Sequence, residues 1–252
     1  MRTLTNFIFL FVFAMSFAQS KYKSILNDID KNKETYSDIA QQIWSFAEMG
    51  YQEEKSSKLL QKTLEQEGFQ IEVGVVEIPT AFVASFGSGS PVLAILGEYD
   101  ALPGLSQKAV PYKVSNNGKA GHACGHHLFG SASAAAAIAI KNYLLKEGKS
   151  GTVKFYGCPA EEGGSGKVYM TRAGLFDNVD VALHWHADNK NAASIRPALA
   201  NKSAKFRFYG VSAHAAGAPE KGRSALDAVE AMNTMVNMMR EHVTDDTRIH
   251  YV

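Results

Sequence analysis

The sequence predicts an α/β fold, an open sheet with flanking helices, followed by the start of a smaller α+β domain. Three observations predict it. Amphipathic helical patterns alternate with short apolar runs of strand length. Acidic and histidine residues directly follow several of these runs, as is typical of the carboxyl ends of strands in open α/β sheets. After about Asn191 the pattern changes to one half-exposed strand and one helix, which predicts a domain boundary between residues 195 and 196.

Composition argues against several classes of protein. The chain has 252 residues, of which 46% are hydrophobic and 20% charged, as in ordinary globular proteins. A net charge of +1 gives no support for binding to nucleic acid or to an anionic membrane surface. Two cysteines are too few for a disulfide framework, although a single Cys124–Cys158 bridge is an alternative. The sequence has no nucleophile-elbow serine motif, no Walker loop and no dinucleotide fingerprint.

Residues 1–18 have the pattern of a signal peptide. Arg2 supplies a positive charge, Phe7–Ala14 is a short apolar run, and Ser16–Ala18 is a small-x-small cleavage signal. The apolar run is short for a bilayer span, with an uncleaved anchor as the alternative. The mature chain is therefore expected to begin at Gln19 and to be secreted or periplasmic, with no membrane attachment after cleavage.

Residues 19–195 are predicted to form the first domain from alternating helices and strands. Apolar residues at helical spacing predict four helices, over Lys21–Glu48, Glu53–Glu67, His126–Lys146 and Lys167–Ala173. Short apolar runs between turn residues predict extended segments, at Phe69–Val76, Phe82–Phe86, Val92–Leu96, Thr152–Tyr156 and Val179–Leu183. A long loop, Ala101–Gly121, is predicted to connect the third of these to the third helix.

Residues 196–252 are predicted to start a second domain. Lys202–Tyr209 alternates polar and apolar residues, which predicts a half-exposed strand. Ser224–Arg240 has a helical pattern with a methionine-rich face. We expect that face to pack in a core or an interface rather than to bind a cofactor.

The residues that carry chemistry concentrate between His122 and His127, where three histidines and one cysteine fall within six positions. An acidic stretch, Glu98–Asp100, precedes them, and the pair Glu161–Glu162 and the segment His184–His186 follow. An isolated histidine or cysteine is usually a satisfied polar residue or a small buried hydrophobe. Thiolate, imidazole and carboxylate groups gathered in this way are instead the ligands of a transition metal, so the sequence predicts a metal site.

Four motifs follow one another along the chain: Gly97–Gly104, Gly121–His126, Pro159–Glu162 and Gly210–Ala216. In this order they resemble metallopeptidase family twenty, the aminoacylase and carboxypeptidase-like metallohydrolases, and most of all its amidohydrolase branch. The resemblance covers roughly residues 25–245. It implies a zinc-peptidase-like catalytic domain with a mixed open sheet, followed by part of a dimerisation (lid) domain.

The resemblance also implies roles for individual residues. Those that match ligands of two divalent ions, zinc or manganese, are Cys124, His126, Glu162 and His186. Glu161 matches the general base, with a solvated acidic turn as the alternative. His214 matches a second-domain histidine that reaches the partner's site in a homodimer and steadies the oxyanion; without the resemblance it would be an ordinary loop histidine. Asp100 is expected beside the metals as a supporting carboxylate.

Two departures from the family pattern stand out. His127 occupies a position where relatives usually carry Asp or Asn, so its role is open. The family also has a metal-binding histidine near its carboxyl end, and we expect this chain to be truncated before that residue.

The function implied by the resemblance is metal-dependent amide hydrolysis by a metal-activated water. The expected substrates are N-acyl or N-aroyl amino acids such as p-aminobenzoyl-glutamate. The alternatives are a dipeptidase or carboxypeptidase of the same family, or a non-catalytic metal-binding or dimerising fragment. No nucleic-acid partner is expected.

Overall fold

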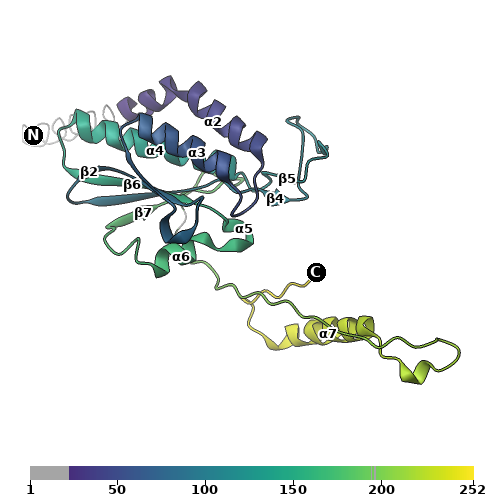
Figure 1. The fold of residues 1–252 in the computed structure, drawn as a ribbon. Coiled ribbons are helices and arrows are strands. Elements are labelled where there is room, and N and C mark those ends of the chain that lie inside the picture. The colour runs from purple at the N-terminus through teal and green to yellow at the C-terminus, as the bar shows by residue number, and fades with distance from the viewer. Residues whose placement is uncertain (1–22, 194, 196) are drawn as a thin grey trace, which may run out of the picture. The chain divides into compact units, whose positions relative to one another are not determined.

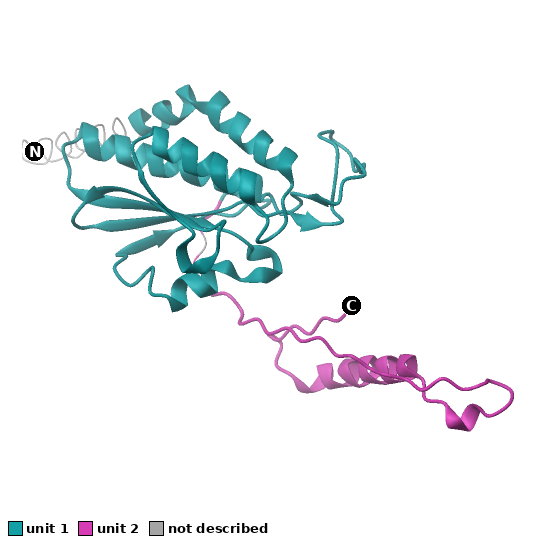
Figure 2. Cartoon of the chain, viewed as in Figure 1, with its two compact units in different colours: residues 1–191 teal, residues 192–252 magenta. Residues whose placement is uncertain are grey.

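The computed structural model describes residues 23–193, 195 and 197–252, so the predicted signal peptide lies outside the described residues. The chain divides into two compact units between Asn191 and Ala192 (Figure 2). This division lies four positions before the domain boundary expected from the sequence, between residues 195 and 196. Each unit is described by itself below.

The first unit is built on a five-stranded sheet with the strand order β1-β2-β6-β3-β7 (Figure 1). The strands are β1 (Gln70–Val73), β2 (Phe82–Ser88), β3 (Val92–Glu98), β6 (Gly151–Cys158) and β7 (Val181–Leu183). β3 runs parallel to β6 and β7, whereas β2 is antiparallel to β1 and β6. The predicted α/β fold with a mixed sheet is therefore confirmed, and all five predicted extended segments contain a strand.

Three long helices cover one face of this sheet (Figure 1). They are α2 (Lys33–Phe46), α3 (Glu54–Gln66) and α4 (His126–Lys146). Strand residues that alternate in sequence pack against them, for example Phe82 on β2 and Phe155 on β6, whose rings stack with centroids 5.6 Å apart. Small residues of α4, Ala134 and Ala137, are fully buried, so the helix lies close to the sheet.

The opposite face of the sheet carries a smaller core. The alternate strand residues Val83 and Tyr156 are buried there with Met170 of the short helix α6 (Gly166–Arg172).

Among the described residues, only α4 is long and apolar enough to span a membrane, and 56% of that stretch is buried within the protein. α4 is therefore the central helix of a sheet-based core.

Two connections differ from the prediction. The first predicted helix, Lys21–Glu48, is interrupted: residues 23–31 are helical, Asn32 leaves the helical region, and α2 then begins. The long loop after β3 contains a small two-stranded sheet, β4 (Leu102–Pro103) with β5 (Ala120–Gly121). Both differences arise from single turns and short pairings that produce no periodic apolar pattern.

The second unit contains the helix α7 (Ala225–Met239), as predicted, and Ser224 caps its start by accepting a hydrogen bond from the backbone N–H of Asp227 at 3.0 Å. The strand predicted over Lys202–Tyr209 is wrong, because no strand in the described part of the chain pairs with this exposed segment. No residue of α7 is buried, so its methionine face does not pack in a core within the described residues. The alternative prediction, an interface, stays a prediction.

Candidate metal centre

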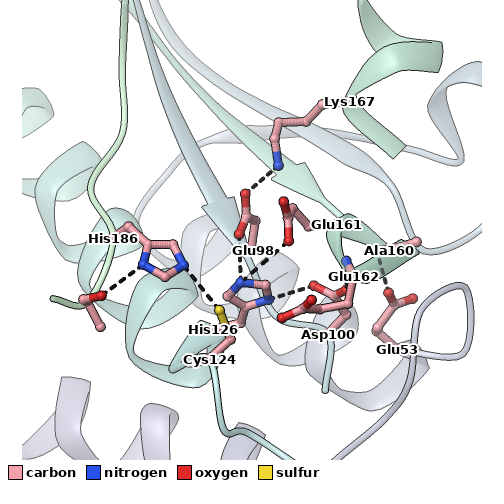
Figure 3. A network of polar contacts seen from close by, with 11 residues as sticks. Glu53, Glu98, Asp100, Cys124, His126, Ala160, Glu161, Glu162, Lys167 and His186 are labelled. Carbon is pink, nitrogen blue, oxygen red and sulfur yellow. Dashed lines mark hydrogen bonds and ion pairs between the residues drawn. The ribbon is translucent and has the colours of Figure 1, made fainter. Parts of the chain in front are cut away.

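Acidic and histidine side chains meet where the parallel strands end (Figure 3). Glu98 closes β3 and pairs in register with Cys158, the last residue of β6. The chain after β6 enters a short helical turn, α5 (Glu161–Gly164), and the chain after β7 leads to His186. Since parallel strands bring their carboxyl ends to one edge of the sheet, these three segments converge there.

His126, the first residue of α4, lies at the middle of this group and is fully buried. Its Nδ1–H donates to Oδ1 of Asp100 at 2.8 Å, because a carboxylate can only accept. Its Nε2 lies 2.9 Å from Oε2 of Glu98 and 3.9 Å from Oε2 of Glu161. Burial would lower the pKa of His126, but the carboxylates of Asp100 and Glu98 raise it to about 10.

Cys124 and His186 form the second half of the group. Nδ1–H of His186 donates to the carbonyl of Ala187 at 2.9 Å, which leaves Nε2 as the acceptor. Nε2 faces Sγ of Cys124 at 3.2 Å, so the thiol donates to it. Burial, and then the neighbouring Glu162 carboxylate, raise the pKa of Cys124 to about 12. The protein groups alone therefore keep this thiol protonated at neutral pH.

Cys124 and Cys158 are both free, so the alternative of a disulfide bridge between them is wrong.

Asp100 connects the group to the acidic turn. Its second oxygen accepts a hydrogen bond from the backbone N–H of Glu162 at 2.8 Å. The next carboxylate, Glu161, is exposed on the turn. Partial burial and then repulsion from Glu98 raise its pKa, which favours a carboxylate that takes up and releases a proton.

The donor set fits a divalent cation. Three buried atoms of the group have no hydrogen-bond partner: Oε2 of Glu98, Nε2 of His126 and Oε1 of Glu162. Nε2 and Oε2 are at ion-pair distance, yet they are not aligned for a hydrogen bond. Buried polar atoms without partners are rare, and divalent cations bound among these side chains would give such atoms a partner. The Asp100–His126 contact is also the usual support for an imidazole that binds metal through its other nitrogen.

Three of the four predicted ligands come together: the ligand atoms of Cys124, His126 and His186 lie within 4.8 Å of one another. Glu98, His126 and Glu161 form a second such group that shares the same imidazole. The fourth predicted ligand, Glu162, belongs to neither group, although its carboxylate raises the pKa of Cys124. Its role as a ligand stays a prediction.

His122 and His127 do not join the group, although they belong to the same cluster in the sequence. Their rings contact each other with centroids 5.1 Å apart, and Nε2–H of His122 donates to the carbonyl of Ile43 at 3.0 Å. Burial lowers the pKa of each ring to about 4, so both are neutral at physiological pH. His127 follows His126 on α4, and adjacent residues of a helix point about 100° apart, so its ring lies away from the group. His122 lies before α4 begins, and its ring is held by the carbonyl of Ile43.

Two residues of the site, Glu98 and Lys167, have no role predicted from the sequence. Glu98 contacts His126 and also forms an ion pair with Nζ of Lys167. The position of Glu98 at a strand end is the signal that could have identified it. No comparable signal exists for Lys167, which follows a glycine-rich turn in the sequence.

Cation binding is expected to release about two protons at neutral pH, one from Nε2 of His126 and one from Sγ of Cys124. With pKa values of about 10 and about 12, both groups are protonated at pH 7 in the protein alone. The apparent affinity for Zn²⁺ should therefore rise with pH. Calorimetric titration in two buffers of different ionisation heat counts the protons. The Cys124→Ser variant should release about one proton fewer when it binds the cation. Identical heats of binding in both buffers would contradict proton release.

Fold and cluster together define the chain as an α/β protein with a candidate metal centre at the ends of its parallel strands. Residues 94–247 match peptidase family M20/M25/M40. The chain is 50% identical over 236 residues to a p-aminobenzoyl-glutamate hydrolase subunit of Escherichia coli K12, covering 92% of this chain and 49% of that protein. It is 32% identical over 238 residues to human Xaa-Arg dipeptidase, covering 88% of this chain and 51% of that enzyme.

These similarities show that the chain belongs to peptidase family M20/M25/M40, as the sequence motifs indicated. A crystal structure from methicillin-resistant Staphylococcus aureus, described as an aminohydrolase, shares the fold with a TM-score of 0.54 at 24% identity, covering 64% of this chain and 41% of that one. The chain spans about half the length of the curated relatives it matches.

Proposed function

We propose that this protein is a metal-dependent amidohydrolase that cleaves N-acyl or N-aroyl amino acids, with p-aminobenzoyl-glutamate as the leading candidate substrate. The observation that carries the reaction type is the cluster of Cys124, His126 and His186 beside the exposed carboxylate of Glu161. The 50% identity to a p-aminobenzoyl-glutamate hydrolase subunit supports the substrate class.

The residues proposed to hold divalent cations, Zn²⁺ or Mn²⁺, are Cys124, His126, Glu162 and His186. A cation there supplies Lewis acidity, which polarises the amide carbonyl and lowers the pKa of water. Glu161 accepts the proton of the attacking water at its carboxylate and passes it to the leaving nitrogen, so the amide becomes an acid and an amine. Asp100 keeps the proton on Nδ1 of His126 and so keeps Nε2 directed toward the group.

His214 is proposed to stabilise the oxyanion from the partner subunit of a homodimer. Its Nδ1 accepts backbone N–H groups of Ala216 at 3.2 Å and Gly217 at 2.9 Å. The neutral ring therefore carries its proton on Nε2, on an exposed side chain. An N–H held in this way is a suitable donor to a developing negative charge.

A mixing experiment tests the role of His214. His214→Ala is expected to lower kcat by about 100-fold or more while leaving Zn²⁺ affinity unchanged. Glu161→Gln inactivates the other component. When the two inactive variants are mixed and allowed to exchange subunits, one site of each heterodimer combines an intact Glu161 with the partner subunit's His214. Activity should return on mixing; no return would reject action across a dimer.

A dipeptidase is the second candidate, favoured by the 32% identity to Xaa-Arg dipeptidase. The Zn²⁺- or Mn²⁺-loaded protein should be assayed on p-aminobenzoyl-glutamate, on N-acetyl and N-benzoyl amino acids, and on dipeptides. The highest kcat/KM on the aroyl substrate supports the leading proposal, and preference for dipeptides supports the second. Metal binding without turnover on any of these substrates would count against both and favour a non-catalytic role.

We also propose that the protein is secreted or periplasmic. The support is the signal-peptide pattern of residues 1–18. Amino-terminal sequencing of the protein recovered outside the cytoplasm should begin at Gln19. Recovery of the protein with residues 1–18 still attached would reject cleavage at that site.

A further inference from the structure

The turn that carries Glu161 and Glu162 has an unusual backbone. Ala160 and Ser165, the residues on either side of α5, have φ angles of 54° and 58°, in the left-handed region that non-glycine residues rarely occupy. Gly163, within the turn, has a φ of 80°. Such a conformation costs free energy and persists only where surrounding contacts hold it. The position of both carboxylates therefore depends on what contacts the turn.

Both ends of the turn are held by one loop, residues 47–53, which connects α2 to α3. At the start, Oε1 of Glu53 accepts the backbone N–H of Ala160 at 2.7 Å (Figure 3). At the end, the hydroxyl of Tyr51 donates to the carbonyl of Gly164 at 2.6 Å. These contacts join residues 107 and 113 positions apart in the sequence.

The loop and the turn are also in van der Waals contact. A Cβ atom added at Gly50 would lie 3.0 Å from the Cβ of Ala160. One added at Gly164 would lie 2.6 Å from the same Cβ and 2.8 Å from Cε2 of Tyr51. The turn therefore has no room to move toward the loop, and the two hydrogen bonds prevent it from moving away.

Glu53 is itself held in place. It is fully buried, and its second oxygen accepts the hydroxyl of Thr80 at 3.0 Å. The carbonyl of Thr80 in turn accepts the hydroxyls of Ser57 at 2.7 Å and Tyr99 at 2.6 Å. A buried carboxylate is costly unless its oxygens are hydrogen-bonded, and here both are.

The same loop also holds the strand end that bears Asp100. The backbone N–H of Ala101 donates to the carbonyl of Glu48 at 2.8 Å, and Met49 pairs with Ala101 in an isolated β-bridge. Two acidic segments, after β3 and after β6, are therefore aligned against a single loop.

We propose that Tyr51 and Glu53 are positioning residues, which hold the Glu161–Glu162 turn against the loop between α2 and α3 and so set the direction of both carboxylates. We call their two hydrogen bonds, Tyr51 to Gly164 and Ala160 to Glu53, the clamp. The effect on turnover rests on the proposed function. The effect on the turn itself does not.

Four variants of the full chain test the clamp. Glu53→Ala removes the acceptor for Ala160, and Glu53→Gln keeps it, because the side-chain amide oxygen also accepts. Tyr51→Phe removes the bond to Gly164 from a side chain that is 45% exposed, so the fold should tolerate it. Thr80→Val is the matched control. It removes the hydrogen bond from the Thr80 hydroxyl to Glu53, while the bond from Ala160 to the same carboxylate remains.

Hydrogen exchange of the segment 159–166 is the first readout. Glu53→Ala and Tyr51→Phe should each speed its exchange by about 10-fold, which corresponds to one lost hydrogen bond. Glu53→Gln and Thr80→Val should stay within about 3-fold of the parent protein. In the Co²⁺-loaded protein, the visible spectrum should change with Glu53→Ala and remain the same with Thr80→Val.

Kinetics give the second readout. A displaced carboxylate should lower kcat by about 10- to 100-fold in Glu53→Ala with little change in KM, with recovery in Glu53→Gln. If Glu53→Ala and Tyr51→Phe alter exchange, spectrum and kcat no more than Thr80→Val does, the clamp is rejected. If Glu53→Ala does not fold, the comparison of Tyr51→Phe with Thr80→Val in exchange, spectrum and kcat decides whether the clamp exists. A parent protein without turnover would reject the proposed function, while exchange and spectrum would still decide the clamp.

Discussion

Replacing Glu161 with Gln is expected to reduce kcat by about 100- to 10,000-fold while Zn²⁺ binding persists, because general acid–base catalysis contributes a factor of that size. The amide keeps the volume of the side chain but cannot take a proton. Cys124, His126 and His186, whose ligand atoms lie within 4.8 Å of one another, are untouched by the change. The measurements are steady-state kinetics on the best substrate and calorimetric titration with Zn²⁺.

Two further substitutions make this prediction specific. Glu162→Gln changes the adjacent carboxylate, and if Glu162 is a ligand it should weaken Zn²⁺ binding as well as turnover. Glu54→Gln is the control, because Glu54 is exposed and its ion pair with Lys58 spans 3.9 Å. This variant should leave both Zn²⁺ binding and turnover unchanged. A Glu161→Gln protein with kcat within about 10-fold of the parent would remove Glu161 from its role as the base.

The sequence predicted most of the first unit because its elements have strong local patterns. The helix His126–Lys146 was predicted with the bounds that the structure shows, since an alanine-rich apolar stretch follows a glycine there. The convergence of Glu98, Glu161 and His186 followed from one rule, that parallel strands end at the same edge of the sheet. Neither prediction required knowledge of a contact distant in the sequence.

The features that the sequence predicted wrongly or not at all have a common physical cause, which is dependence on distant partners. Lys202–Tyr209 has the alternation of a strand, but a strand forms only with a neighbour, and none in the described residues pairs with it. His122 and His127 belong to the same cluster in sequence as His126, and the sequence assigned neither a role. The ring of His122 lies before α4 and donates to the carbonyl of Ile43, 79 positions away. The hydrogen bond from Ala160 to Glu53 spans 107 positions, and no local pattern predicts it.

His126 is the residue whose loss should have the broadest consequences. His126→Ala is expected to weaken Zn²⁺ binding by at least about 100-fold, because it removes the one imidazole common to both candidate ligand groups. It should also lower the free energy of unfolding of the Zn²⁺-free protein at pH 7 by about 3 kcal/mol. The buried carboxylates of Glu98 and Asp100 would lose the charged ring that lies 2.9 Å and 2.8 Å from them.

The pH dependence separates these two effects of His126. In the folded protein its pKa is raised to about 10, above the usual 6.5, so its ion pairs stabilise the fold fully below pH 6.5 and this contribution is lost as the pH rises through about 10. The penalty of His126→Ala, measured by urea unfolding of Zn²⁺-free protein, should therefore shrink between pH 7 and pH 10. Cys124→Ser should weaken Zn²⁺ binding without this pH-dependent loss, because Cys124 is neutral and makes no ion pair. An equal and pH-independent loss of stability in both variants would mean that His126 serves only to fill space in the core.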